Sequence, residues 1–162
     1  MTSAVETIAQ RSAYVAQALA TMGADPEWDR RLTAYLTAEC LSFADMEFGV
    51  MADALEKEAR ARIHLQAEFG KHFTQNPEAA ARFKEAQRET GVAEEARASQ
   101  YLKPHWAAAK DLMHTPAPTL AAALFKSNMI AREELFCEAG LGPLAMGAVA
   151  ADFHRLGLKE AA

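Results

Sequence analysis

Glu39 stands at the centre of an apolar stripe in a segment of helical spacing. The residues around it on a helical wheel are Trp28, Leu32, Tyr35, Phe43, Met46 and Val50. A carboxylate buried among such side chains is unfavourable unless it is paired with a positive charge, hydrogen-bonded, protonated or bound to a metal ion. The position of Glu39 therefore calls for a chemical explanation.

A later helical segment supplies the complementary groups, because Asn128 and Arg132 lie inside its broad apolar face. One hypothesis is that Arg132 pairs with Glu39, in which case removing either partner would leave the other charge buried and unpaired. Asn128, or a hydroxyl of Tyr35 or Tyr14, would complete the hydrogen bonds. These polar side chains form the candidate buried or ligand-binding set. The alternative is that each of them extends to solvent at a helix edge.

A second group of residues has the types that bind metal ions. His64 and Glu68 lie on one helical face, His72 continues that face one turn later, and Asp111 and His114 form a separate i, i+3 pair. A carboxylate-bridged metal bundle needs two Glu-x-x-His motifs, and the chain contains none. We therefore predict no metal site, and these five residues remain candidates only for the less favoured metal-binding alternative.

The chain carries no motif typical of an enzyme. A nucleophile elbow, a phosphate-binding glycine loop and a dinucleotide-binding fingerprint are all absent from the sequence. His105 follows Pro104 and is a haem-ligand alternative, but a helix kink anchored by Trp106 is the simpler interpretation. We predict no catalytic residue and no cofactor, and we favour a protein that is not an enzyme.

The composition indicates what must position these residues. Alanine makes up nearly a quarter of the 162 residues, whereas valine and isoleucine are scarce. Alanine is the best helix former, and β-branched residues are the ones that favour strands. We therefore predict an all-α fold, organised as one antiparallel helical-bundle domain over residues 1–162.

Helix start and stop signals divide the chain into about six helices. They are expected at residues 3–22, 25–70, 77–90, 92–114, 119–139 and 143–157, with Asn76–Pro77 as the alternative end of the second. The first begins with a capping box at Ser3, and Pro104 is expected to break or kink the fourth. The second is expected to be one long central helix, with two helices meeting near Gly49 as the alternative.

The charge and the N-terminal sequence restrict the function. A net charge of −5 disfavours a nucleic-acid partner, because such proteins usually need a basic face. The N-terminal residues lack the features of a signal peptide, and no apolar run approaches the length of a membrane span, so we expect a cytoplasmic protein without a membrane partner.

We predict a non-enzymatic interaction protein (an adaptor, assembly factor or inhibitor) that acts through a helix face. Its partner would be another protein or a second copy, which makes a homo-oligomer an expectation. The alternative is a helical bundle that binds a small apolar ligand in its core.

Overall fold

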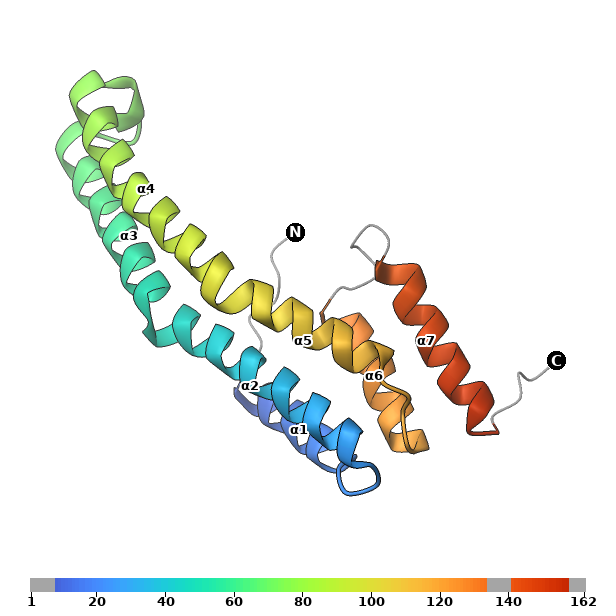
Figure 1. Ribbon diagram of the computed structural model, residues 1–162. Coiled ribbons are helices and arrows are strands. Elements are labelled where there is room, and N and C mark those ends of the chain that lie inside the picture. The colour runs from blue at the N-terminus through green and yellow to red at the C-terminus, as the bar shows by residue number, and fades with distance from the viewer. Residues whose placement is uncertain (1–7, 134–140, 158–162) are drawn as a thin grey trace. The chain divides into compact units, whose positions relative to one another are not determined.

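The computed structural model describes residues 8–133 and 141–157, and these residues form helices and no strand (Figure 1). The predicted all-α class is confirmed. The chain divides into two compact units. The first comprises Met1–Leu36 and Ala107–Ala162, and the second comprises Thr37–Trp106. The prediction that residues 1–162 form a single domain stays a prediction.

The first unit contains α1 (Ile8–Leu19), the first part of α2 (Pro26–Phe48), the last part of α5 (Lys103–His114), α6 (Leu120–Arg132) and α7 (Leu141–Arg155). Helix α6 packs against α1 and α7. The largest fully buried side chains of the described residues all belong to this unit and are Trp28, Leu32, Tyr35, Leu112, Phe125, Lys126 and Met129. One of these seven is a lysine, so a charge lies inside the core.

The second unit is built around a helical hairpin. Helix α3 (Val50–Phe69) and α4 (Pro77–Arg97) lie side by side and antiparallel, joined through the 3-10 turn η1 (Phe73–Gln75) (Figure 1). At the tip, Phe73 and Phe83 meet edge to face with ring centroids 5.3 Å apart. Leu65 and Ala79 complete that cluster, and Met51, Ala54 and Ala93 form a second cluster nearer the α2–α3 junction.

The helix starts predicted at Asp25, at Asn76–Pro77 and at Thr119 are confirmed. The last described helix begins at Leu141, two residues before the predicted start at Pro143. Asp25 accepts a hydrogen bond from the backbone N–H of Trp28 at 2.8 Å, and Asn76 caps α4 through the N–H groups of Glu78 and Ala79. Thr119 caps α6 in the same manner. The predicted capping box at Ser3 lies outside the described residues. A search of the described helices for a membrane span of sufficient length and hydropathy finds none.

The long helix predicted over residues 25–70 is divided at Gly49, so the alternative of two helices meeting there is confirmed. Gly49 has extended backbone angles, with φ −100° and ψ −164°. A Cβ at this position would lie 2.5 Å from Oδ1 of Asp45 and 2.7 Å from the Cα of Asp45. Glycine is therefore required at this bend by a close approach of atoms, not by its backbone angles.

Asp45 is held in place by the hairpin itself. Its buried carboxylate lies 3.6 Å from Nε of Arg97 on α4, and Arg97 also donates a hydrogen bond to Oγ of Ser42 at 3.1 Å. Because Asp45 is fixed from this side, it has little freedom to move away from a side chain introduced at Gly49.

We expect Gly49→Ala to lower the free energy of unfolding by about 1–3 kcal/mol, as overpacking of a tight site does. Gly91→Ala is the matched control, because Gly91 lies inside α4 and a Cβ there would meet nothing within 4 Å. That replacement should raise stability by about 0.5–1 kcal/mol. Urea unfolding measures the free energy of unfolding of both variants. Equal changes of the same sign would contradict the close approach of Asp45 to Gly49.

The helix end predicted at Thr90 and the helix start predicted at Val92 are wrong. The chain remains helical through Thr90 and Gly91, and α4, the π turn η2 (Ala98–Leu102) and α5 follow one another without a break. Thr90 is buried and bonds to carbonyls within α4 and on α3, and one glycine costs a helix only about 1 kcal/mol. The π turn precedes Pro104, and in it the N–H of Lys103 donates to the carbonyl of Ala98, five residues earlier. Pro104 therefore falls in the first turn of α5, where a helix tolerates proline.

Candidate functional site

A cluster of two tyrosines, a glutamate and an arginine joins α1, α2 and the end of α6. Tyr35 is fully buried, and its hydroxyl lies 2.8 Å from that of Tyr14. The Tyr35 hydroxyl also donates to Oε1 of Glu133 at 2.6 Å. Arg132 binds the same carboxylate oxygen at 2.9 Å, and its guanidinium lies 4.1 Å from the centre of the Tyr14 ring. Burial, together with Tyr14 and Glu133, raises the pKa of Tyr35 far above its usual value, so this hydroxyl remains a donor.

A second polar cluster lies inside the first unit, between α6, α7 and the loop that follows α5. Lys126 is 1% exposed, and its ammonium donates to the carbonyl of Thr115 at 2.5 Å and to Oδ2 of Asp152 at 2.7 Å. The other carboxylate oxygen of Asp152 accepts hydrogen bonds from the N–H of Ala117 and from Arg155, each at 3.0 Å. Arg155 also donates to the carbonyl of Ala117. The cluster therefore ties α7 to the rigid Thr115–Thr119 turn.

Burial and hydrogen bonding act differently on the two charges of this second cluster. Burial lowers the pKa of Lys126 in spite of its hydrogen bond to Asp152. Burial by itself would raise the pKa of Asp152, but the hydrogen bonds from Lys126, Ala117 and Arg155 outweigh it and lower that pKa. The Lys126 ammonium also lies 5.8 Å from the centre of the Trp28 ring, a favourable cation–π geometry. Every group of the cluster is engaged with another protein group, which is the arrangement of a structural ion pair.

The candidate polar residues named from the sequence lie in different environments. Glu39 is 4% exposed and belongs to the second unit, whereas Arg132 belongs to the first, so their pairing stays a prediction. Asn128 is exposed and donates to the side chain of Gln17 at 3.2 Å. The prediction that Asn128 lies inside the apolar face of its helix is wrong, because Lys126 faces the core and turns Asn128 toward solvent.

Sequence reasoning missed several buried or half-buried charged residues, among them Lys126, Asp152, Glu133 and Asp45. A signal for the first two exists. Lys126 follows Ala122 by four residues and precedes Met129 by three, and Asp152 follows Val149 by three. Each therefore interrupts an apolar stripe, and the two interruptions have opposite charge.

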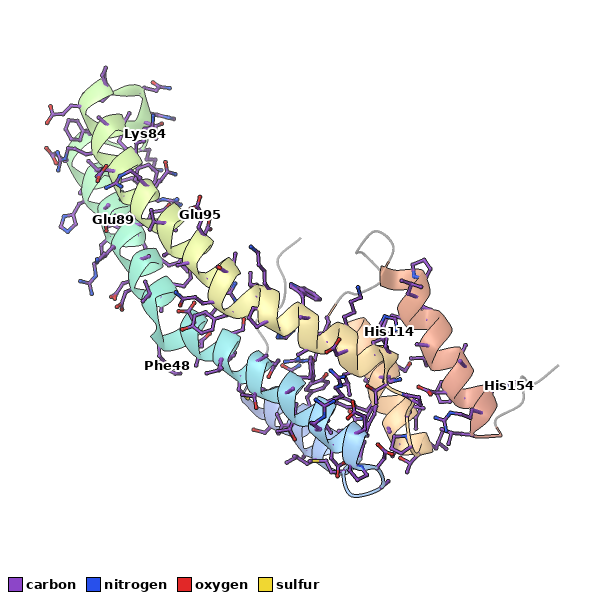
Figure 2. All side chains as sticks on the ribbon, in the orientation of Figure 1. Phe48, Lys84, Glu89, Glu95, His114 and His154 are labelled. Carbon is purple, nitrogen blue, oxygen red and sulfur yellow. The ribbon has the colours of Figure 1, made fainter. Side chains whose placement is uncertain are left out.

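The five residues considered for metal binding are all exposed. Glu68 pairs with Arg82 at 3.0 Å, and Asp111 pairs with Arg31 at 2.5 Å. Figure 2 shows His114 at the end of α5. Over residues 8–133 and 141–157, no three histidine, cysteine or carboxylate side chains are grouped so that they could hold a metal ion.

Several large apolar side chains of the second unit are exposed. Phe48 is 83% exposed and Val50 is 68% exposed, on either side of the Gly49 bend, and Figure 2 shows Phe48 on the outer side of that bend. Leu41 lies two turns before Phe48 on the same face of α2 and is also exposed. We call Leu41, Phe48 and Val50 the bend surface.

The α3–α4 hairpin has two unlike faces. One face carries ion pairs between the helices, Lys57 with Glu89 at 3.7 Å and Glu68 with Arg82 at 3.0 Å. Helical spacing places a stripe of α3 on the opposite face, formed by Ala52, Leu55, Ala59 and Ile63. Gln87 and Gly91 of α4 lie on that side as well.

Comparisons of the chain with protein-family models, with curated proteins and with solved structures find no match.

Proposed function

We propose that this chain is a non-enzymatic interaction protein and that the bend surface binds another protein. The observation that carries the proposal is the 83% exposure of Phe48, the most exposed large apolar side chain of the described residues. Phenylalanine is enriched at protein interfaces, and burying such a side chain contributes about 1.5–3 kcal/mol.

The surroundings of Phe48 support the same proposal. The residue stands beside Gly49, whose backbone N–H donates to the carbonyl of Asp45 at 3.0 Å, so Phe48 extends from the last hydrogen-bonded turn of α2. A rigid aromatic side chain loses little conformational entropy when a partner covers it. The net charge of −5 favours a protein partner over a nucleic acid, and we place this interaction in the cytoplasm.

The alternative of an apolar ligand held in the core has less support. Large side chains such as Trp28, Phe125 and Met129 are fully buried in the first unit, as in a filled core. A depression along α1 is open to solvent and is lined by Arg11, Ser12, Val15, Ala16 and Leu19. Ligand sites usually enclose most of the ligand surface, which a single helix does not do.

Photo-crosslinking tests the proposed function. A photoreactive phenylalanine analogue is placed at Phe48 in cells that naturally contain the chain, with the same analogue at exposed Glu95 of α4 as the control. We expect a discrete crosslinked species from position 48 that is absent from position 95, and its loss when Leu41→Ser and Val50→Ser are added. Equal crosslinking at both positions would refute the proposal.

A further inference from the structure

We infer, on the basis of the proposed function, that the partner of the bend surface is a basic amphipathic helix of another protein. Its apolar face covers Phe48, and its lysine or arginine side chains meet the carboxylates of Glu47 and Asp53. The bend surface combines exposed apolar side chains with a local excess of negative charge, and each of these two features restricts the chemistry of the partner.

The exposed side chains of α2 have the spacing of a face that packs against another helix. Leu41, Ala44 and Phe48 are all exposed, and they follow one another at positions i, i+3 and i+7. This spacing aligns side chains along one side of a helix over about 10 Å, at 1.5 Å per residue. Val50, directly after the bend, is 68% exposed as well. A partner helix can therefore lie along this side of α2.

The negative charge of the chain is concentrated around the same face. Residues 32–56 contain five acidic residues and neither lysine nor arginine, and the other residues of the chain hold equal numbers of acidic and basic side chains. The net charge of −5 therefore comes from this one stretch. Two of its acids, Glu39 and Asp45, are buried, and a third, Glu56, pairs with Arg60.

Glu47 and Asp53 are the acids of residues 32–56 that are exposed and form no ion pair with a described residue. Glu47 is adjacent to Phe48 on α2, and Asp53 follows Val50 by one turn on α3. Lys57, one turn after Asp53, is engaged with Glu89 of α4 at 3.7 Å. Further along the hairpin the acids have cationic partners, as in the pairs Glu58–Arg62, Glu68–Arg82 and Glu85–Arg88.

These charges favour a basic partner over the other occupants of the bend surface. Complementary charges at the rim of an apolar surface accelerate association with the matching partner and oppose partners of the same sign. A second copy of the chain, bound through the same surface about a twofold axis, would bring Glu47 and Asp53 close to their own copies, which is repulsive. An anionic lipid surface would be repelled in the same way.

Fluorescence anisotropy with two labelled peptides tests the charge of the partner. The basic peptide is a helix of about 18 residues, or five turns, with leucine on one face and lysine on the other. The acidic peptide has glutamate in place of every lysine. We expect the full chain to bind the basic peptide, more weakly as the salt concentration rises from about 50 to about 300 mM, and not to bind the acidic one. Equal affinity for the two peptides would overturn the inference.

Two charge reversals test the position of the binding site. Glu47→Lys should weaken binding of the basic peptide about fivefold or more, whereas Glu95→Lys should change it less than about twofold. The two residues are a matched pair, because both are exposed, both lie in the last turn of a helix, and both reversals change the net charge equally. Figure 2 shows Glu95 on α4 and Phe48 at the bend, on different sides of the second unit.

Phe48→Ser should weaken the same binding about tenfold or more, because the apolar contact is lost. Circular dichroism verifies that each variant keeps its helices. If Glu47→Lys and Glu95→Lys weaken binding equally, the peptide responds to net charge alone and the inference is wrong.

Crosslinking in cells separates this inference from the proposed function. With the photoreactive analogue at position 48, the crosslinked species should disappear when Glu47→Lys is added and remain when Glu95→Lys is added. A species that persists with Glu47→Lys would leave the proposed function standing and refute the basic partner. A species with twice the mass of the chain would identify a second copy, which also refutes it. Failure of the proposed function itself would be seen earlier, as the absence of any discrete species while Glu47 is unchanged.

Discussion

Asp152→Ala is expected to lower the free energy of unfolding by about 3–5 kcal/mol at neutral pH, the usual result of breaking a buried ion pair. The replacement leaves the Lys126 ammonium 1% exposed in the core, with the Thr115 carbonyl as its remaining oxygen partner among the bonds described above. It also frees the N–H of Ala117, which loses its acceptor. Urea unfolding of the wild type and the variant measures the difference.

The pH dependence of this difference has a definite sign. The pKa of Asp152 is lowered in the folded state, whereas the pKa of an aspartate in an unfolded chain is about 3.9. The stability that Asp152 contributes is therefore present above about pH 4 and is lost as the pH falls through the lowered folded pKa. We expect the gap between wild type and Asp152→Ala to narrow in acid.

Two controls separate a buried ion pair from a general loss of charge. Lys126→Met combined with Asp152→Leu removes both charges and should recover most of the lost stability. Glu85→Ala removes one partner of the exposed Arg88–Glu85 pair and should have no measurable effect. A loss of under about 1 kcal/mol for Asp152→Ala would contradict the structural role given to this pair.

Three helix starts could be predicted from the sequence because each depends on residues within one turn. Asp25, Asn76 and Thr119 cap helices through hydrogen bonds to N–H groups two or three positions ahead. Such a contact can be predicted from the local sequence alone, because both of its partners lie within one turn. The same is true of the all-α class, which follows from composition.

The helix interruptions could not be predicted so well, because they depend on residues distant in the chain. Gly91 has the same local signal as a stop, yet α4 continues there because Thr90 packs against α3. At Gly49 the close approach of Asp45 leaves no room for a side chain, and Asp45 also lies 3.6 Å from Arg97, which is 52 positions further along the chain than Asp45. A helical wheel contains no information on either contact.

The polar residues illustrate the same limit. Sequence reasoning placed Asn128 in the apolar face of its helix and assigned no role to Lys126, whose residue type is rarely buried. Which of the two positions on α6 is buried, 126 or 128, depends on whether the facing helix carries an opposite charge at that level. Asp152 supplies that charge 26 residues later. The pairing of opposite charges in two separate apolar stripes is the pattern that would have identified it.

Phe83→Ala is expected to lower the free energy of unfolding by about 3–5 kcal/mol and to act within the second unit. Phe83 is 8% exposed, meets Phe73 edge to face, and packs with Leu65 and Ala79 at the tip of the hairpin. The Arg62 guanidinium lies 5.4 Å from the centre of its ring. The tip has few other large buried side chains, so the cavity left by the ring would be difficult to fill by relaxation.

Amide hydrogen exchange measures which residues lose stability in Phe83→Ala. If the two compact units have separate cores, amides of residues 37–106 should exchange faster in Phe83→Ala, and those of the first unit should change much less. Val92→Ala is the control, because it shortens an exposed apolar side chain on the same hairpin and should stay within about 0.5 kcal/mol of the wild type. Equal acceleration in both units would mean that they unfold as one, and a Phe83→Ala loss no larger than that of Val92→Ala would contradict the buried cluster at the tip.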